Sequence, residues 1–86
     1  MNINQLNEIV KNKIKKNISC ESIEIEDKTF LHKSHSSHDK NKFHIKLIIT
    51  SDYLKKKNKI QCTKEIYKIL EDEIKNNIHS IQLLIN

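Results

Sequence analysis

The chain has 86 residues and a formal net charge of +5, and all 16 of its basic residues are Lys. This length allows one small domain over residues 1–86, because two halves would each be too short to bury a core without disulfides or metal. Hydrophobic residues make up 36% and charged residues 31% of the chain, which excludes wholesale disorder, and no apolar run is long enough to span a membrane.

The composition is strongly biased. Lys, Ile and Asn account for 42 of the 86 residues, and Gly, Ala, Pro, Arg and Trp are absent. The frequent residues have A/T-rich codons, so the bias is typical of an AT-rich genome. Much of the Lys excess is therefore interpreted as solvated surface, which weakens the inference from positive charge to nucleic-acid binding.

Two elements are predicted in the first third of the chain. Residues 4–18 favour a helix, because apolar side chains recur there at steps of three and four residues. Asn2 or Asn4 can cap its start. Residues 22–26 alternate between polar residues and isoleucine, which predicts a short strand with the isoleucines facing inward.

A polar segment follows, residues 27–42, and it holds His32, His35 and His38. It is predicted to be a loop. It is long for so small a domain, and such loops are usually functional or mobile. Because it has few apolar residues, we expect it to be among the most mobile parts of the unbound protein.

The second strand is predicted at Phe43–Thr50, with alternate aliphatic residues on one face and His44 on the other. Residues 51–57 are predicted to be a connection. A second helix is predicted from Asn58 onward, because Asn58 with Gln61 fits a capping box and apolar residues then recur at four-residue steps.

Polar residues mark the end of this second helix. The acidic residues 71–73 are expected late in the helix, where they oppose its dipole. Asn76 and Asn77 are predicted to stop the helix in a left-handed conformation, since the chain has no glycine. Ile78–Ile85 then alternates and predicts a third strand.

The predicted fold class is a small α+β domain with the order helix, strand, strand, helix, strand. The first two strands should be antiparallel. The third should lie parallel to the second, because a strand–helix–strand unit prefers a right-handed crossover to a parallel neighbour. This mixed three-stranded sheet would bring His44, His79 and the 27–42 loop to one end.

Histidines gathered in this way could bind a metal ion, because imidazole is a good metal ligand near neutral pH. For His38 alone, polar filler is the favoured interpretation. His44 is interpreted as a strand residue with a packing or supporting role. Position in the sequence leaves His79 open between a ligand and a hydrogen-bonded residue at a helix–strand junction.

The two cysteines are too few for a disulfide framework, and Cys20 is interpreted as a partly buried thiol and Cys62 as a buried one. Cys62 lies on the apolar stripe of the second helix, so its thiol should react slowly with alkylating reagents in the native state. No order of Ser or Cys with His and Asp suggests a catalytic triad, and no glycine loop can cradle phosphate. An enzymatic function is therefore not predicted.

Four segments together resemble the BolA family. Residues 27–35 resemble its D-x-S-x-x-H-x-x-H loop, and residues 44–54 resemble its H-F-x-V-x-[IV]-V-S-x-x-F strand. Residues 66–74 resemble its V-Y-x-x-L-x-x-E-[LI] helix, and residues 78–81 resemble its [IV]-H-A-[LF] signature. The resemblance covers nearly the whole chain, in order and with consistent spacing.

The resemblance implies a fold similar to the type II KH fold and a partnership with monothiol glutaredoxins. Members of the family share a glutathione-containing [2Fe–2S] cluster with the glutaredoxin, in iron–sulfur cluster assembly, trafficking or iron regulation. His79 matches the family's signature histidine ligand, and His32 and His35 match its loop ligand. His44 and His38 are the alternative or supporting positions. We expect a cytoplasmic protein, with nuclear access also open and an organellar location only if a targeting segment was removed. It should be monomeric when alone and have no membrane role.

Nucleic-acid binding is the alternative function. A KH-like fold and lysines such as Lys59 and Lys64 favour it, and these two could instead contact a protein partner. KH domains clamp nucleic acid with a G-x-x-G loop, however, and this chain has neither Gly nor Arg. The family's R-H-R segment is also replaced here by Cys62, Thr63 and Lys64. Any such binding is therefore expected to be weak and electrostatic.

Overall fold

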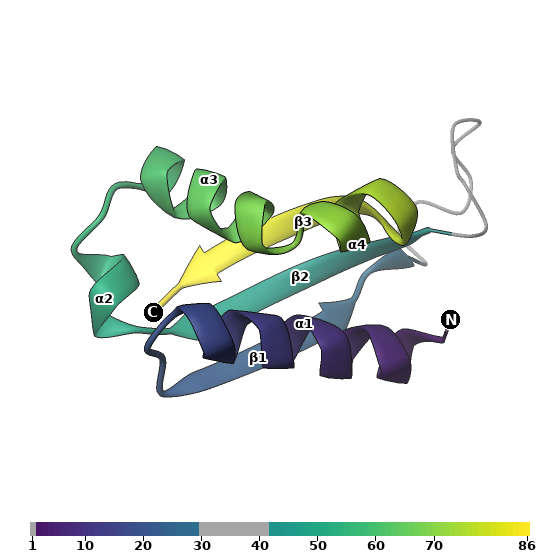
Figure 1. Ribbon diagram of the computed structural model, residues 1–86, viewed down its shortest axis with the longest axis horizontal. Coiled ribbons are helices and arrows are strands. Elements are labelled where there is room, and N and C mark those ends of the chain that lie inside the picture. Colours follow the sequence, from purple (N-terminus) through teal and green to yellow (C-terminus); the bar gives the residue numbers. More distant parts are fainter. Residues whose placement is uncertain (1, 30–41) are drawn as a thin grey trace.

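The structure, a computed structural model, describes residues 2–29 and 42–86 (Figure 1). The predicted α+β fold and its mixed three-stranded sheet are confirmed. The helices and strands are, in chain order, α1 (Ile3–Asn17), β1 (Ser22–Asp27), β2 (Phe43–Thr50), α2 (Asp52–Lys55), α3 (Lys59–Ile69), α4 (Glu71–Asn76) and β3 (Ile78–Ile85).

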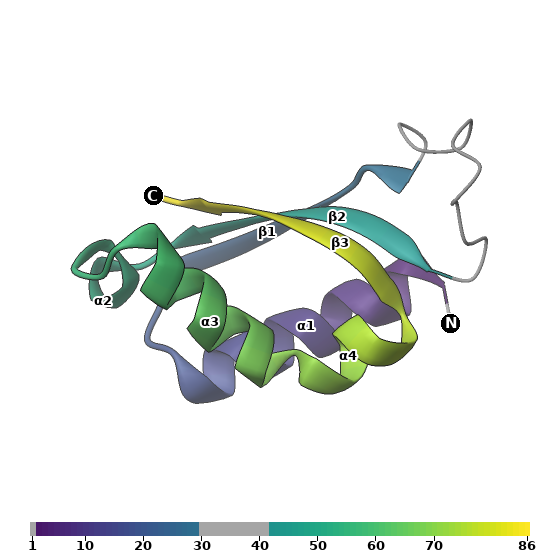
Figure 2. The ribbon, with the colours of Figure 1, turned by 90° about the horizontal axis from the view of Figure 1, so that it is seen from above.

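The sheet has the order β1-β2-β3, with β1 antiparallel and β3 parallel to the central strand β2. The predicted parallel pairing of the second and third strands is therefore confirmed. Figure 2 shows that α1, α3 and α4 lie beneath one face of the sheet and that no described helix covers the other. The strands consequently alternate between a face that packs on helices and an open face.

The core lies between this sheet and the helices. The alternation of β2 points Ile45, Leu47 and Ile49 at the helices, and each is at most 2% exposed. The predicted apolar stripe of α1 packs against the same face of the sheet, with Leu6, Val10 and Ile14 buried. The buried apolar residues are Leu6, Val10, Ile14, Ile18, Ile23, Ile45, Leu47, Ile49, Leu54, Cys62, Ile66, Leu70 and Ile78. The predicted burial of Cys62 is thus confirmed.

Both long helices begin with a capping box. Asn2 caps α1, and its side chain accepts a hydrogen bond of 2.8 Å from the backbone N–H of Gln5. Asn58 caps α3 in the same way, as predicted: its side chain accepts a hydrogen bond of 2.8 Å from the backbone N–H of Gln61. These bonds satisfy backbone donors that a helix start leaves without an intrahelical partner.

The connection predicted at residues 51–57 contains a short helix instead, α2. Ser51 caps it, since its Oγ accepts the N–H of Leu54 at 3.2 Å. The same Oγ donates to the carbonyl of Ser19 at 2.7 Å, and Leu54 is fully buried. Tertiary contacts of Ser51 and Leu54 therefore stabilise this turn of helix, which the lysine-rich local sequence does not predict.

The second helix is not continuous as predicted, because the chain turns at Leu70 between α3 and α4. Leu70 has φ −99° and ψ 20°, which is outside the helical region, and it stays fully buried. Residues 71–73 therefore lie in the first turn of α4, where acidic side chains favour the helix dipole and do not oppose it.

The predicted left-handed stop at the asparagine pair is also wrong. Asn77 has φ −131°, and no described residue has a positive φ. The N–H of Asn77 makes the last helical bond, to the carbonyl of Glu73 at 2.7 Å, and the carbonyl of Asn77 then leaves the helix to accept the N–H of Phe43 on β2 at 2.9 Å. Pairing with the neighbouring strand takes the place of a left-handed residue.

An ion pair fixes α4 on α1. Lys13 Nζ donates to both carboxylate oxygens of Glu73, at 2.9 and 2.8 Å, and the Glu73 side chain is only 9% exposed. Asp72, next to it, is 82% exposed and lies 3.9 Å from the same ammonium. Both carboxylates share the first turn of α4, so only burial and hydrogen bonding distinguish them.

We expect Glu73→Ala to lower the free energy of unfolding by about 1–2 kcal/mol, because hydrogen bonds to a charged group are lost while Lys13 can still reach water. Asp72→Ala, the matched control, should change it by less than about 0.5 kcal/mol. Urea unfolding measures both. Equal losses for the two variants would contradict the assignment of the stabilising contact to Glu73.

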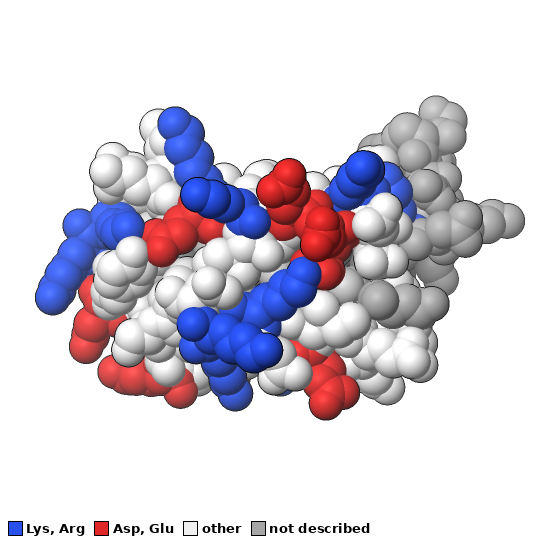
Figure 3. Space-filling model, viewed as in Figure 1, with Lys and Arg blue, Asp and Glu red and all other residues white. Residues whose placement is uncertain are grey.

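Lysines are dispersed over the face drawn in Figure 3, and acidic side chains lie between them. No single positive field covers that face. The lysines drawn there are surface side chains interspersed with acidic ones, which agrees with the interpretation of the Lys excess as solvated surface.

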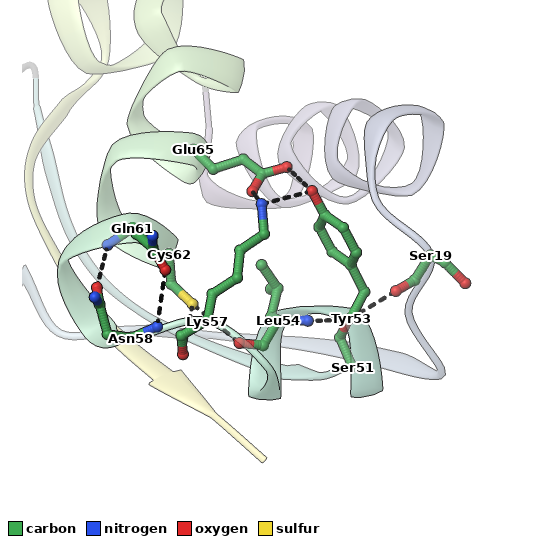
Figure 4. Close-up of polar contacts among 9 residues, drawn as sticks. All are labelled: Ser19, Ser51, Tyr53, Leu54, Lys57, Asn58, Gln61, Cys62 and Glu65. Atoms are coloured by element: carbon green, nitrogen blue, oxygen red, sulfur yellow. Dashed lines mark hydrogen bonds and ion pairs between the residues drawn. The ribbon is translucent and has the colours of Figure 1, made fainter.

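A charged cluster joins α2 to α3 (Figure 4). Lys57 Nζ donates to Glu65 Oε2 at 2.8 Å and to the hydroxyl of Tyr53 at 2.7 Å, and that hydroxyl donates to Glu65 Oε1 at 2.9 Å. The hydrogen bond from Lys57 lowers the pKa of the Glu65 carboxyl below its ordinary value, and the carboxylate in turn raises the pKa of Lys57. We call these three residues the clamp.

Stability should depend on the ionisation of Glu65. Because its pKa is lower in the folded state, the clamp stabilises the protein above the pKa of the unfolded chain and stops doing so as pH falls through the folded value. The difference in free energy of unfolding between the protein and Glu65→Gln should therefore shrink from pH 6 to pH 3. A difference that stays constant over this range would contradict the clamp.

Candidate metal-ligand site

The start of β2 holds His44 in a fixed place. Its side chain lies on the open face of the sheet, yet the residue is only 5% exposed. Its backbone N–H donates to Thr29 Oγ1 at 3.2 Å, and its carbonyl accepts from the N–H of Lys28 at 2.7 Å. Thr29 is itself held by Asp27, whose Oδ1 accepts its N–H at 3.0 Å. The end of β1 therefore positions this histidine.

A β-bulge at the start of β3 positions His79. Phe43 pairs with Ile78 and His44 pairs with Ser80, so His79 is the extra residue between two pairs. Bulges shift the alternation of side chains by one. As a result His79 and Ser80 both lie on the open face, between Ile78 and Ile81, which pack on the core.

The bulge places His79 beside His44. Their ring centroids are 4.7 Å apart and the planes are tilted by 39°. His79 is exposed, whereas His44 is buried. Ser80 contributes from the same strand, since its Oγ lies 2.7 Å from His44 Nδ1. A buried, hydrogen-bonded imidazole thus supports an exposed one that a second molecule can reach.

The structure describes only part of the predicted site. It brings His44 and His79 together, as the predicted topology requires. His32, His35 and His38, and most of the loop predicted to be mobile, lie outside the described residues. Within residues 2–29 and 42–86, no three His, Cys, Asp or Glu side chains gather closely enough to hold a metal ion.

The lysines predicted to contact nucleic acid or a partner are not part of this histidine pair. Lys59 begins α3 and lines a cavity with Leu83 and Leu84 of β3. Lys64 lines a different cavity, on the side of α3 that faces Asn17 of α1. None of the described helices is long and apolar enough to cross a membrane.

Ser80 and Thr29 were missed by the sequence reasoning. Both act through contacts with His44 that cross from one strand to another, and such contacts depend on the bulge. The sequence did contain one signal for Ser80, because the family's [IV]-H-A-[LF] signature has Ala at this position. A hydroxyl in place of a methyl group indicates that the side chain has a hydrogen-bond partner.

The chain matches the family model for BolA-like protein over residues 14–86. It is 30% identical over 78 residues to the DNA-binding transcriptional regulator BolA of Haemophilus influenzae, covering 91% of this chain and 73% of that protein. It is 28% identical over 80 residues to the chloroplastic/mitochondrial SufE-like protein 1 of Arabidopsis thaliana, covering 87% of this chain but only 22% of that protein.

Solved structures show the same fold. The BolA domain of SufE1 from Arabidopsis thaliana has a TM-score of 0.76 at 24% identity, covering 100% of this chain and 93% of that one. BolA1 from Mus musculus has a TM-score of 0.70 at 14% identity, covering 90% of this chain and 60% of that one. With the family match over residues 14–86, these findings show that the chain belongs to the BolA-like family.

Proposed function

We propose that this chain is a non-enzymatic partner of a monothiol glutaredoxin and supplies a histidine ligand to a glutathione-containing [2Fe–2S] cluster shared by the two proteins. The role would lie in iron–sulfur cluster assembly, trafficking or iron regulation. The observation that carries the proposal is the exposed imidazole of His79 on the bulge, backed by the buried ring of His44. The name of one relative, SufE-like protein 1, agrees with such a role.

The histidine pair fits the chemistry of a shared cluster. An imidazole binds iron through a neutral nitrogen, and packing that fixes its ring reduces the cost of ordering it on binding. The ring of His79 packs against the ring of His44 and is exposed to a partner. In this proposal a loop histidine, His32 or His35, supplies the second ligand of this chain, and two imidazoles on one iron raise the potential of a [2Fe–2S] centre.

Anaerobic reconstitution tests the proposal. The chain is mixed with a monothiol glutaredoxin, iron, sulfide and glutathione, and visible absorption, circular dichroism and size-exclusion chromatography are recorded. We expect a complex of the two proteins whose cluster spectrum differs from that of the glutaredoxin alone. If a complex forms but the spectrum is unchanged, the chain binds glutaredoxin as an adaptor and supplies no ligand. If the two proteins form no complex, the proposed partnership is wrong.

Nucleic-acid binding is the second candidate, favoured by the name of the Haemophilus influenzae relative, DNA-binding transcriptional regulator BolA. Lys59 and Lys64 are both on α3 and line different cavities, and the chain has neither Gly for a G-x-x-G loop nor Arg for base contacts. We therefore propose only weak, electrostatic binding, whose affinity falls steeply with salt. Tight, sequence-selective binding that persists at high salt would contradict this.

A further inference from the structure

Strand β3 forms an edge of the sheet that carries no protecting charge. The order β1-β2-β3 leaves both outer strands with one open side. Edge strands usually avoid pairing with other chains by carrying charged residues or Pro. The outer strand β1 carries Glu24, Glu26 and Asp27, whereas Ile78–Ile85 contains no Lys, Asp, Glu or Pro. Figure 2 shows β3 at the near edge, above α3.

The backbone groups that face this open side can be assigned from the parallel ladder. Asn86 donates its N–H to the carbonyl of Ile49 at 2.8 Å and accepts the N–H of Ser51 at 3.2 Å, so both of its groups face β2. In a parallel pair, alternate residues turn both groups to the same neighbour. The residues whose N–H and C=O groups turn outward are therefore Ile81, Leu83 and Ile85.

A groove runs between this edge and α3. One cavity of about 350 Å³ and another of about 470 Å³ share Lys59, Leu83 and Leu84, so they adjoin along β3. Apolar side chains are exposed along it, with Tyr67 at 40% and Leu84 at 43%. We call this combined cavity the edge groove.

The edge groove is positively charged. Lys46, Lys55, Lys57 and Lys59 line it, and among the described residues no Asp or Glu does. Lys57 is neutralised by Glu65 of the clamp. The other three form no ion pair with any residue in the described ranges. The groove therefore has an apolar floor and a rim of lysines that suits an acidic ligand.

The wall of the groove is held in place before any ligand binds. The clamp ties α2 to α3, and Cys62 Sγ donates to the carbonyl of Leu54 at 3.2 Å (Figure 4). The capping box of Asn58 orders the turn between them. A preformed site loses less conformational entropy on binding.

We propose that the edge groove binds an extended acidic segment of a partner protein, which adds to β3 as a fourth strand. Outward backbone groups pair with a peptide backbone, and the apolar floor takes alternate side chains. A second β3 would bring two sets of these lysines together, which disfavours self-pairing. Nucleic acid has no backbone that matches a strand edge. The proposal does not rest on the proposed function at His79.

An acetylated peptide with the sequence of residues 21–27, in which isoleucines alternate with acidic residues, is the probe. It is titrated into the full chain, and amide exchange is followed by NMR. We expect exchange at Ile81, Leu83 and Ile85 to slow by about tenfold or more at saturation, because these amides gain partners. Binding without protection of these amides would overturn the proposal.

Two variants with equal charge change separate the groove from general electrostatics. Lys46→Glu with Lys59→Glu should weaken peptide binding by about tenfold or more. Lys64→Glu with Lys68→Glu, on the side of α3 towards α1, should change it less than about twofold, since screening limits distant charges. Equal weakening by both pairs would show non-specific attraction and overturn the proposal.

Peptides methylated on the backbone nitrogen test strand addition without altering the protein. Two isomers of the peptide are made, each methylated at every second backbone nitrogen, so that the methyl groups lie on one edge in the first isomer and on the other edge in the second. Only one edge of the peptide faces β3, so one isomer should lose binding and the other should keep it. Equal binding of both isomers would contradict the proposal. Two further results would contradict it: self-association of the chain that the peptide reverses, and protection of the same amides by a single-stranded oligonucleotide.

The variant His79→Ala should bind the peptide with unchanged affinity, which separates this site from the histidine pair.

Discussion

Replacing His79 by Ala should abolish the histidine-ligated spectrum of the [2Fe–2S] cluster that we propose is shared with a glutaredoxin, while the fold remains intact. The side chain is exposed and lies on the open face of the sheet, so its loss should change the free energy of unfolding by less than about 0.5 kcal/mol. Loss of a ligand removes a bond to iron directly. Visible circular dichroism of the reconstituted complex and thermal unfolding of the chain alone measure the two effects.

Ser80→Ala is the control for this experiment. It removes the contact at His44 Nδ1 and leaves the proposed ligand in place, so the cluster should form with lower affinity and a similar spectrum. Single replacements of His32 or His35 should weaken the centre only in part, and the double replacement should remove it. An unchanged spectrum in His79→Ala would make His44 or a thiol the ligand.

Leu47→Ala should be the most destabilising simple truncation in the sheet. Leu47 lies in the central strand β2 and is fully buried. Truncation of a buried Leu costs about 3–4 kcal/mol, from lost burial and from the cavity left behind. A domain of this size has a total stability of about 5–10 kcal/mol, so this one change removes a large part of the free energy of unfolding.

Ile48→Ala is the matched control, because Ile48 is the next residue along β2 and lies half-buried on the open face. Its truncation should cost about 1 kcal/mol or less, since less apolar area is removed from contact. Urea unfolding measures the free energy of unfolding of both variants, and its slope against urea concentration should be the same in each. Similar losses at the two positions would show that the helices do not cover the face assigned to Leu47.

Much of the fold could be predicted because its periods are local. The stripe of α1, the alternation of β2 and the capping box at Asn58 all depend on neighbouring residues. The turn at Leu70 could not be predicted. It contains neither Gly nor Pro, and it joins a buried leucine to a helix whose Glu73 reaches Lys13 on α1. Contacts distant in sequence decide it.

The candidate site divides in the same way. That His44 and His79 lie at one end of the sheet follows from the parallel pairing of their strands, which the strand–helix–strand order predicts. Their ring contact depends on the bulge at His79, and one extra residue in a ladder leaves no clear local pattern. The supporting hydroxyl of Ser80 depends on that same register.

The most direct test of the central claim is pulsed electron paramagnetic resonance of the reduced cluster in a complex labelled on one side. The chain carries ¹⁵N only in its histidines, and the glutaredoxin and glutathione are unlabelled. We predict two strongly coupled ¹⁵N nuclei, one from His79 and one from a loop histidine, and the loss of the His79 coupling in labelled His79→Ala. A cluster held in the complex with no strongly coupled ¹⁵N from this chain would contradict the account.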